Sequence, residues 1–381
     1  MNLIEDWLSL SHHKGLNRTL LRHIVEHFSE LDRLKEINDA RWLATGLNTQ
    51  GVRRIKCSLC IGPDQKRLSA DLHWLEKDAT HHLIPINSRQ YPNLLAQIED
   101  PPLLIYSVSE DLEKSLHAPT LAIVGSRNAS PYGAELATEF AYQLAQRGIN
   151  SISGMAYGVD AAAHRGSLSS KYATTTAVFG CGVDHIYPRQ HTALAAEIAQ
   201  QGALVSEYCC GTTPRRAHFP QRNRIISGLS YGTLVIEAGA RSGSLITAKL
   251  ALEQSRELFA LPGNLHNPLT CGCHRLIQQG AKLVTCIDDI VDEIACFNRL
   301  QPPHITPQMR PSIHDSKQRT LLAWLKSLPL TIDVVAEKSG LTTEQVCSML
   351  STLELSGQVT RDRSGRYHAV ATEKIHERKR T

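Results

Sequence analysis

The chain has 381 residues, of which 42% are hydrophobic and 20% charged, and its formal net charge is +4. This length predicts two or three domains with a large core, and the composition is that of an ordinary soluble protein. Its ten irregularly spaced cysteines do not form a disulfide framework, and no apolar run reaches signal or membrane-spanning length, so we expect a cytoplasmic protein without membrane contact.

The excess positive charge lies at the C-terminal end. Residues 361–381 contain seven Lys or Arg and three Asp or Glu, an excess of four that equals the net charge of the whole chain. Residues 1–360 are therefore formally neutral. Contact with nucleic acid must come from local basic grooves rather than from a global field.

Residues 1–75 have the pattern of a small helical domain. Residues 41–56 contain two glycines among basic side chains. Two interpretations stand: a helical hairpin that binds a nucleic-acid backbone, and a packing domain with a solvated basic face, which we favour. Apolar residues recur at helical spacing, namely Leu20, Leu21, Ile24, Val25 and Phe28.

Residues 78–298 alternate between short apolar runs and helical patterns. Strands buried on both faces read as continuous apolar runs, and alternation with helices predicts right-handed crossovers and a parallel sheet. The fold class is therefore α/β, an extended Rossmann-like, doubly wound, mostly parallel sheet. The predicted strands are 121–125, 148–153, 174–180, 203–207, 233–238 and 257–263.

The C-terminal part divides into three segments. Residues 299–316 are rich in proline and lack periodicity, which predicts a linker. Residues 317–372 show three short amphipathic helices and two strands, the pattern of a winged helix, and residues 373–381 form a basic tail. The expected recognition helix lies within 341–360, which has no Lys or Arg. Because groove-reading helices need cations beside the phosphates, we favour a protein-interaction or regulatory role.

Ligands of an open parallel sheet bind outside the carboxyl ends of its strands, so the strand-to-helix turns are candidate sites. The turn Gly125-Ser126-Arg127 combines close backbone approach, a hydroxyl donor and an arginine fork, which favours phosphate binding over a salt bridge at the sheet edge. A second turn contains Gly154 and Gly158. Asp160 and His164 follow it, either as an acid–base or metal couple or as a helix cap with a buried histidine, which we favour.

Two further turns carry aromatic or basic residues. Tyr187 and Arg189 combine an aromatic ring with a cation, which suits base stacking and phosphate contact, while a core position for the tyrosine is an equal alternative. The stretch 219–249, extended upstream through Arg215 and Arg216, has a basic helix opening and then the turn Ser242-Gly243-Ser244. There Gly243 permits a sharp turn, the hydroxyls donate to an anion, and helix N–H groups add positive partial charge.

Two nucleotide-binding signatures are missing. The sequence has no Gly-Lys dipeptide, hence no Walker A loop, and no G-x-G-x-x-G after a predicted strand. Cys57 and Cys60 lie far from Cys271, Cys273 and His274, and the spacing of the latter three is unusual for zinc. We therefore expect no metal and no cofactor.

Seven segments in order closely resemble the DNA-processing protein A family, also called Smf. They are LAIVGSR, SISGMAYGVDAAAHRGSL, VFGCGVDHIYPRQ, LVSEY, FPQRNRIISGLS, VIEAGARSGSLITAKLALEQSRELFALPG and LIQQGA, within about residues 80–290. The resemblance implies a Rossmann-like domain that binds single-stranded DNA, forms homodimers and loads the recombinase RecA during natural transformation, with no catalysis. It also implies a SAM-like or helix-hairpin-helix N-terminal extension and a winged-helix C-terminal extension.

The resemblance and the turns together define a candidate site for single-stranded DNA, with Arg127 as the strand-gripping arginine. Its residues are Gly125, Ser126, Arg127, Gly154, Gly158, Arg189, Arg222, Asn223, Arg224, Ser242, Gly243, Ser244 and Lys249.

A rival interpretation is an enzyme. Gly232-Thr233 followed by Glu237 loosely resembles the signature of nucleotide phosphoribohydrolases, which have a related Rossmann-like fold. Glu237 would then act on a ribose and Arg127 would hold a monophosphate. The spacing differs and a preceding Gly-Gly is missing, so we favour DNA binding.

Overall fold

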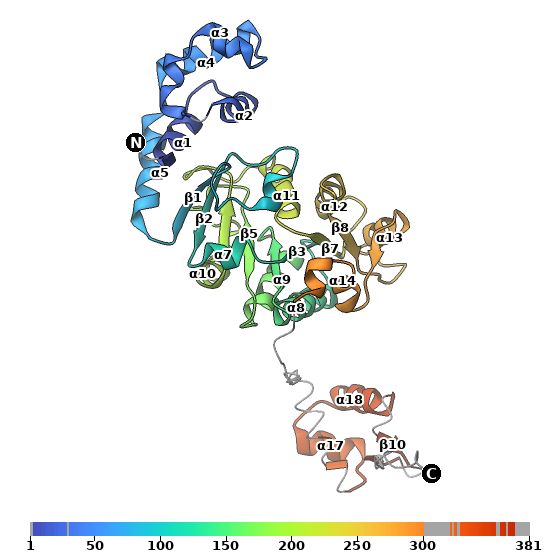
Figure 1. Cartoon of the computed structure of the whole chain (residues 1–381). Coiled ribbons are helices and arrows are strands. Elements are labelled where there is room, and N and C mark those ends of the chain that lie inside the picture. The colour runs from blue at the N-terminus through green and yellow to red at the C-terminus, as the bar shows by residue number, and fades with distance from the viewer. Residues whose placement is uncertain are drawn as a thin grey trace, which may run out of the picture. The chain divides into compact units, whose positions relative to one another are not determined.

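The computed structural model describes residues 3–28, 30–300, 321, 324–325, 328–355, 359–362 and 365–369. The chain forms two compact units, Met1–Pro303 and His304–Thr381, each of which is considered by itself. Figure 1 shows their elements. No helix within the described residues is long and apolar enough to cross a membrane.

The first unit begins with helices, which confirms the helical pattern predicted there. Short polar side chains start several of them: Asn17, Asn38, Asn48 and Asp64 each accept a hydrogen bond from the backbone N–H three residues ahead, which satisfies a donor that the helix leaves free. The elements are α1 (Leu3–Ser11), α2 (Arg18–His27), the 3-10 helix η1 (Leu31–Glu36), α3 (Asp39–Ala44), α4 (Thr49–Ile61) and α5 (Gln65–Lys77).

A nine-stranded sheet follows, with strand order β1-β2-β6-β5-β4-β3-β7-β8-β9. Strands β3 to β8 occupy the six predicted runs and are parallel to one another, which confirms the α/β, mostly parallel fold class. The strands are β1 (His81–Pro85), β2 (Leu104–Ser109), β3 (Thr120–Gly125), β4 (Asn150–Ser153), β5 (Thr175–Val178), β6 (Ala203–Ser206), β7 (Gly232–Ile236), β8 (Glu257–Ala260) and β9 (Lys282–Leu283).

The predicted runs omit β1, β2 and β9. β1 pairs antiparallel with β2, and β2 pairs antiparallel with β6, so they extend one edge of the parallel sheet. β9 is a two-residue strand beside β8 at the other edge.

Helices cover both faces of the sheet because alternate residues of each strand point to opposite sides. Ala122 and Val124 of β3 pack in a core with α11, α12 and α13, whereas Leu121 and Ile123 pack in a second core with α8 and α9. The helices are α6 (Asn93–Ala96), α7 (Leu112–Leu116), α8 (Pro131–Gln146), α9 (Val159–Leu168), η2 (Arg189–His191), α10 (Thr192–Gln201), α11 (His218–Gly228), α12 (Ser244–Glu253), α13 (Cys271–Gln278), α14 (Asp288–Val291) and α15 (Ala295–Asn298).

The N-terminal helices share a core with the sheet. Leu8 of α1 and Trp74 of α5 are buried with Tyr106 of β2. Asp71 of α5, fully buried, accepts a hydrogen bond from the Tyr106 hydroxyl (2.5 Å) and lies 2.7 Å from His12 Nε2. These contacts hold α1 and α5 against the β1–β2 edge.

The second unit contains α17 (Ile332–Ser339), α18 (Thr343–Leu355) and a hairpin of β10 (Val359–Arg361) and β11 (Tyr367–Ala369). Val335, Val346 and Val359 share its core. Helices followed by a hairpin confirm the predicted winged-helix pattern. Residues 301–316 of the predicted linker and the tail 373–381 lie outside the described residues.

Candidate nucleic-acid interface

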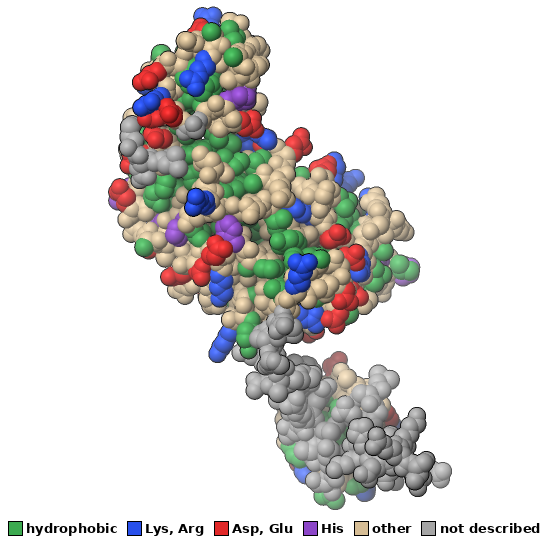
Figure 2. Space-filling view, in the orientation of Figure 1, with side chains coloured by type: hydrophobic (Ala, Val, Ile, Leu, Met, Phe, Trp, Pro, Cys, Tyr) green, Lys and Arg blue, Asp and Glu red, His purple; other side chains and the backbone are tan. Residues whose placement is uncertain are grey.

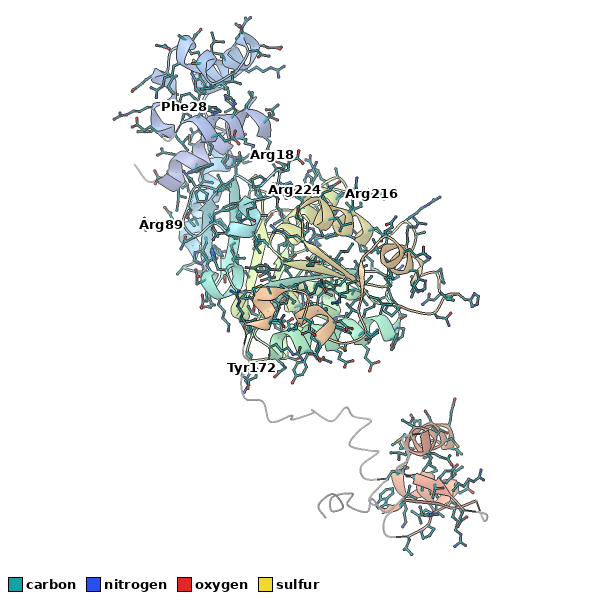
Figure 3. All side chains as sticks on the ribbon, turned by 45° about the vertical axis from the view of Figure 1, so that its right-hand side comes forward. Arg18, Phe28, Arg89, Tyr172, Arg216 and Arg224 are labelled. Atoms are coloured by element: carbon teal, nitrogen blue, oxygen red, sulfur yellow. The ribbon has the colours of Figure 1, made fainter. Side chains whose placement is uncertain are left out.

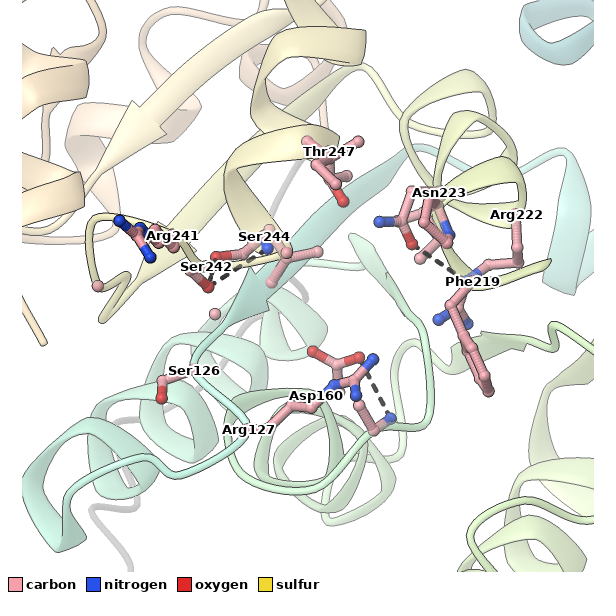
Figure 4. A pocket seen from close by; sticks show the side chains of 18 of the residues that line it. Ser126, Arg127, Asp160, Phe219, Arg222, Asn223, Arg241, Ser242, Ser244 and Thr247 are labelled. Atoms are coloured by element: carbon pink, nitrogen blue, oxygen red, sulfur yellow. Dashed lines mark hydrogen bonds between the residues drawn. The ribbon is translucent and has the colours of Figure 1, made fainter. Parts of the chain in front are cut away.

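A cavity of about 830 Å³ lies at the carboxyl ends of β3 and β7. Most of its lining comes from the loop after β3, the turn after β4, the first turns of α11 and the turn that joins β7 to α12 (Figure 4). Asp160 of α9, Tyr187 from the loop after β5, Arg216 and Leu269 complete it. This is the position at which an open parallel sheet binds its ligands. Of the thirteen candidate residues, the cavity brings together Gly125, Ser126, Arg127, Arg222, Asn223, Ser242, Gly243 and Ser244.

The lining of this cavity is basic. Its charged residues are four arginines and one acid, Asp160, an excess of three positive charges (4 − 1). Arg127, Arg216 and Arg241 are exposed, and among the described residues Arg216 and Arg241 have no side-chain partner. On the face of the molecule shown in Figure 2, acidic and basic side chains are interspersed. The cavity therefore favours an anionic ligand, as a local groove in a nearly neutral surface.

Two glycines shape the loop after β3. A Cβ on Gly125 would lie 1.9 Å from the carbonyl oxygen of Ile236, and one on Gly158 would lie 2.2 Å from that of Ser126. Gly158 also has φ +74°, which disfavours any other residue. Both glycines therefore let the backbone of β3, β7 and the α9 start approach closely, which sets the position of Ser126 and Arg127.

The Ser242-Gly243-Ser244 turn opens α12 at the cavity. Ser242 Oγ lies 2.7 Å from Ser244 Oγ, so one hydroxyl donates to the other and the second keeps its proton for a ligand. The N–H groups of Ser244, Leu245 and Ile246 already have acceptors at 3.1–3.4 Å within the turn. The hydroxyls and the helix dipole are therefore among the groups that this turn presents to an anion.

An aromatic surface forms another wall. The Arg127 guanidinium lies 5.7 Å from the centre of the Phe219 ring, and the rings of Phe219 and Tyr187 are 5.5 Å apart. Tyr187 is 46% exposed, which decides against the core position that the sequence left open for it. A planar group can therefore meet aromatic and cationic surface together.

Arg222 lies beneath the cavity rather than projecting into it. Its side chain is buried and donates to the carbonyl oxygens of Gly154 (2.8 Å) and Val178. Burial lowers the pKa of Arg222 to about 10, opposed by the nearby Asp160 carboxylate. Arg222 is still charged at neutral pH, so it adds positive potential while holding the ends of β4 and β5 together.

Asp160 and His164 do not form a reactive couple. Asp160 accepts hydrogen bonds from the backbone N–H of Gly154 (3.1 Å) and Ala156 (3.2 Å). His164 is fully buried beside Thr175, and burial lowers its pKa to about 3, so it is neutral. The buried histidine is confirmed. The Asp160 carboxylate, however, binds N–H groups of the turn before α9 and does not cap this helix, whose N-cap residue is Gly158.

The remaining candidate residues do not line the cavity. Arg224 lies on another side of α11, where it pairs with Glu207 (2.6 Å). Lys249 is exposed beside Glu253 (3.3 Å), and Arg189 is exposed on η2. Gly154 lies under the Arg222 guanidinium, which a Cβ would approach to 2.5 Å, and Gly158 supports the loop after β3.

The cavity also contains residues outside the candidate set. Arg216 lies in the upstream extension of the stretch 219–249, and Phe219 is the first residue of that stretch. Arg241 lies within the same stretch, and a cation directly before the Ser242-Gly243-Ser244 turn is a usable signal for anion binding. All three line the cavity.

Glu237, the residue of the rival interpretation, is occupied elsewhere. Its carboxylate accepts from the backbone N–H (2.8 Å) and the hydroxyl of Ser130, the N-cap residue of α8. It does not line the cavity. No cluster of three His, Cys, Asp or Glu able to hold a metal ion exists within the described residues.

Comparison with known proteins assigns the family. The model described as DNA recombination-mediator protein A matches residues 82–295, and that of the DprA winged helix domain matches residues 306–365. Protein Smf of Escherichia coli is 42% identical over 323 residues, 83% of each chain. DNA processing protein DprA of Bacillus subtilis is 42% identical over 55% of this chain and 70% of its own length.

Two solved structures agree with this assignment. The DNA processing protein A of Streptococcus pneumoniae has a TM-score of 0.65 and 33% identity, over 77% of this chain and 98% of its own. That of Helicobacter pylori, studied for its single-stranded DNA binding mode, has a TM-score of 0.50 and 29% identity, over 57% and 96%. The chain belongs to the DprA/Smf family of DNA-processing proteins.

Proposed function

We propose that this chain binds single-stranded DNA in the cavity and does so without catalysing a reaction on it. The observation that carries the proposal is the Arg127 guanidinium over the Phe219 ring in a cavity with excess positive charge. A single strand offers phosphates to the arginines and hydroxyls, and unpaired bases offer flat faces to Phe219 and Tyr187. A duplex keeps those faces stacked inside, so the single strand is the better ligand.

The test is fluorescence anisotropy with labelled single-stranded and double-stranded oligonucleotides of equal length over a salt series. We expect single-strand preference, little sequence preference, and a log–log salt slope of about −0.7 for each phosphate neutralised. Affinity that does not change with salt, or equal binding of the duplex, would contradict the proposal.

The wider role follows from family membership. We propose that the chain acts as a cytoplasmic homodimer which protects incoming DNA and loads the recombinase RecA onto it during natural transformation. Sedimentation would report the oligomeric state, and the rate of RecA filament formation on single-stranded DNA would report loading. A monomer at working concentration, or an unchanged filament rate, would remove the corresponding part of this proposal.

A phosphoribohydrolase activity is the second candidate, and it predicts a result with Glu237→Gln. We expect no free base from nucleoside monophosphates with either wild type or variant, because the carboxylate holds Ser130 and lies outside the cavity lining. The variant should lose roughly 1 kcal/mol of stability, since it weakens the contact at the α8 N-terminus. Base release that Glu237→Gln abolishes would establish the enzyme instead.

We also propose the domain organisation of a helical domain at 1–75, a DNA-binding domain at 78–298, a linker at 299–316, a winged helix at 317–372 and a tail at 373–381. The described exposed positions of α18, such as Thr343, Ser348 and Thr352, offer no cation to phosphates. We therefore expect a chain that lacks residues 310–381 to keep wild-type single-strand affinity within about threefold, since phosphate contacts dominate such affinity. A larger loss in the same anisotropy assay would place part of the DNA site in the C-terminal unit.

A further inference from the structure

A second cavity, of about 450 Å³, lies between the N-terminal helices and the sheet within the first unit. Ser11 and Arg18 line it from the first helices and Arg67 lines it from α5. Residues 102–104, before and at the start of β2, and residues 207–209, after β6, line its other side. No function assigned above uses this cavity.

The two cavities lie on either side of one short segment, residues 212–221. Arg215 lines the second cavity and its neighbour Arg216 lines the first. In the first turn of α11 the alternation continues, because His218 faces the second cavity and Phe219 the first. A polymeric ligand that leaves the first cavity across residues 212–221 therefore enters the second cavity.

The second cavity offers the same chemistry as the first. Its charged residues are Arg18, Arg67 and Arg215, with Glu207 as the acid, an excess of two positive charges (3 − 1). Arg67 and Arg215 are exposed, and the Arg215 guanidinium has no partner within the described part of the chain. Two arginines without a strong partner, one from α5 and one from the segment 212–221, are suited to a phosphodiester.

The acid in this cavity is already neutralised. Glu207 Oε2 lies 3.0 Å from Arg18 Nη2 and 2.6 Å from Arg224 Nη2, and Asp100 contacts the same two arginines at 3.1 and 3.4 Å. Figure 3 shows Arg18 at the base of the N-terminal helices near Arg224 on α11. Glu207 therefore does not repel an anion. The four ion pairs among Arg18, Arg224, Asp100 and Glu207 also fix α2 against α11.

Flat and apolar surface completes the cavity. The rings of Tyr208 and His218 stack at 4.3 Å with an interplanar angle of 17°, and Leu21, Pro102 and Leu103 form an apolar wall. Both rings are partly buried and stack on each other, so each ring has one face covered and keeps its edge and part of its other face for a ligand. A nucleobase fits such a wall while its phosphate meets Arg67 or Arg215.

We propose that the second cavity is a further subsite for the same DNA strand, so that single-stranded DNA runs from the first cavity across residues 212–221 and is held by Arg215 and by Arg67 of the N-terminal helices. This proposal rests on the proposed function, since it lengthens the track that begins at Arg127. The N-terminal helices are then part of the DNA-binding surface through α5, not through residues 41–56.

The test uses the full-length protein and two oligonucleotides, of about 6 and about 15 nucleotides, which lie near the two ends of the usual range of site sizes for single-strand binding. Wild type should bind the longer oligonucleotide more tightly and with a steeper salt slope, by about 0.7 for each extra phosphate contact. Arg67→Ala and Arg215→Ala should each weaken the longer complex roughly three- to tenfold and leave the shorter one unchanged.

Lys66→Ala is the matched control, because Lys66 precedes Arg67 on α5, has the same charge and does not line the cavity. Both arginines are exposed, and equal urea midpoints would verify that the variants fold. If Arg67→Ala and Arg215→Ala bind the longer oligonucleotide as tightly as Lys66→Ala does, the second subsite is wrong, while Arg127-dependent binding of the shorter one keeps the proposed function. If the shorter one binds independently of Arg127, both are wrong.

Discussion

Replacing Arg127 by alanine should reduce the affinity for single-stranded DNA by roughly ten- to a hundredfold at low salt, because it removes a charged, bidentate phosphate donor and the cation over the Phe219 ring together. Among the lining arginines, Arg127 is the one with this ring contact. Fluorescence anisotropy between about 50 and about 200 mM salt measures both the affinity and the loss in salt slope, about 0.7 for one phosphate.

Arg127→Lys separates the two contributions. Lysine retains the charge and hence most of the salt slope, but it lacks the planar fork and stacks less well on an aromatic ring, so we expect an intermediate affinity. Arg165→Ala is the control for loss of charge, since Arg165 is an exposed residue of α9 outside the cavity lining. Equal losses in Arg127→Ala and Arg165→Ala would show that binding depends on net charge and not on this cavity.

Replacing Arg222 by methionine should destabilise the fold by about 3–5 kcal/mol, the usual cost of removing one partner from a buried charged network. The carbonyl oxygens of Gly154 and Val178 would lose their donor, and the carboxylate of Asp160 would stay buried without the cation that offsets it. Urea unfolding followed by circular dichroism measures the loss. Arg165→Met should unfold at the wild-type midpoint.

The free energy of unfolding of Arg222→Met should also depend on pH differently from that of wild type. Burial raises the pKa of Asp160 in the folded chain, and the Arg222 guanidinium is the largest influence that opposes this rise, so the variant raises the pKa further. A folded-state pKa above the unfolded value of 3.8 means that the folded chain binds the proton more tightly. Protonation of Asp160 therefore stabilises the folded chain at low pH, and this stabilisation is lost as pH rises through the folded-state pKa of Asp160.

We expect the stability deficit of Arg222→Met to shrink as pH falls from neutral toward 3.8, the ordinary pKa of this carboxyl. His164 is neutral in the folded chain, chiefly through burial, so it lowers the stability of both proteins as pH falls, and the difference between variant and wild type is the quantity to compare. Arg222 is a smaller cause that also lowers the pKa of His164, so its removal adds to the same narrowing of the deficit at low pH. A deficit that is constant over this range would mean that Asp160 does not depend on Arg222 for compensation.

Parallel strands such as β3 and β7 were predictable because they are buried on both faces and therefore appear as unbroken apolar runs. β1 and β2 escaped prediction because histidines and serines interrupt their apolar residues, and β9 is too short to produce a pattern. Loop chemistry was also readable: the glycines and hydroxyls after β3 and β7 lie at the cavity where parallel topology places them.

The sequence by itself determined the α/β class, the strand-to-helix turns and the family, since these depend on periodicity and on motifs that are contiguous in the chain. Only the tertiary structure decided which cations line the cavity. Arg222 and Arg224 are two residues apart on α11, and successive residues turn by about 100° around a helix, so the pair points to different sides. One lies beneath the cavity and the other joins the Arg18 network, while Arg241 arrives from another turn, because burial and partners depend on which elements pack around each side chain.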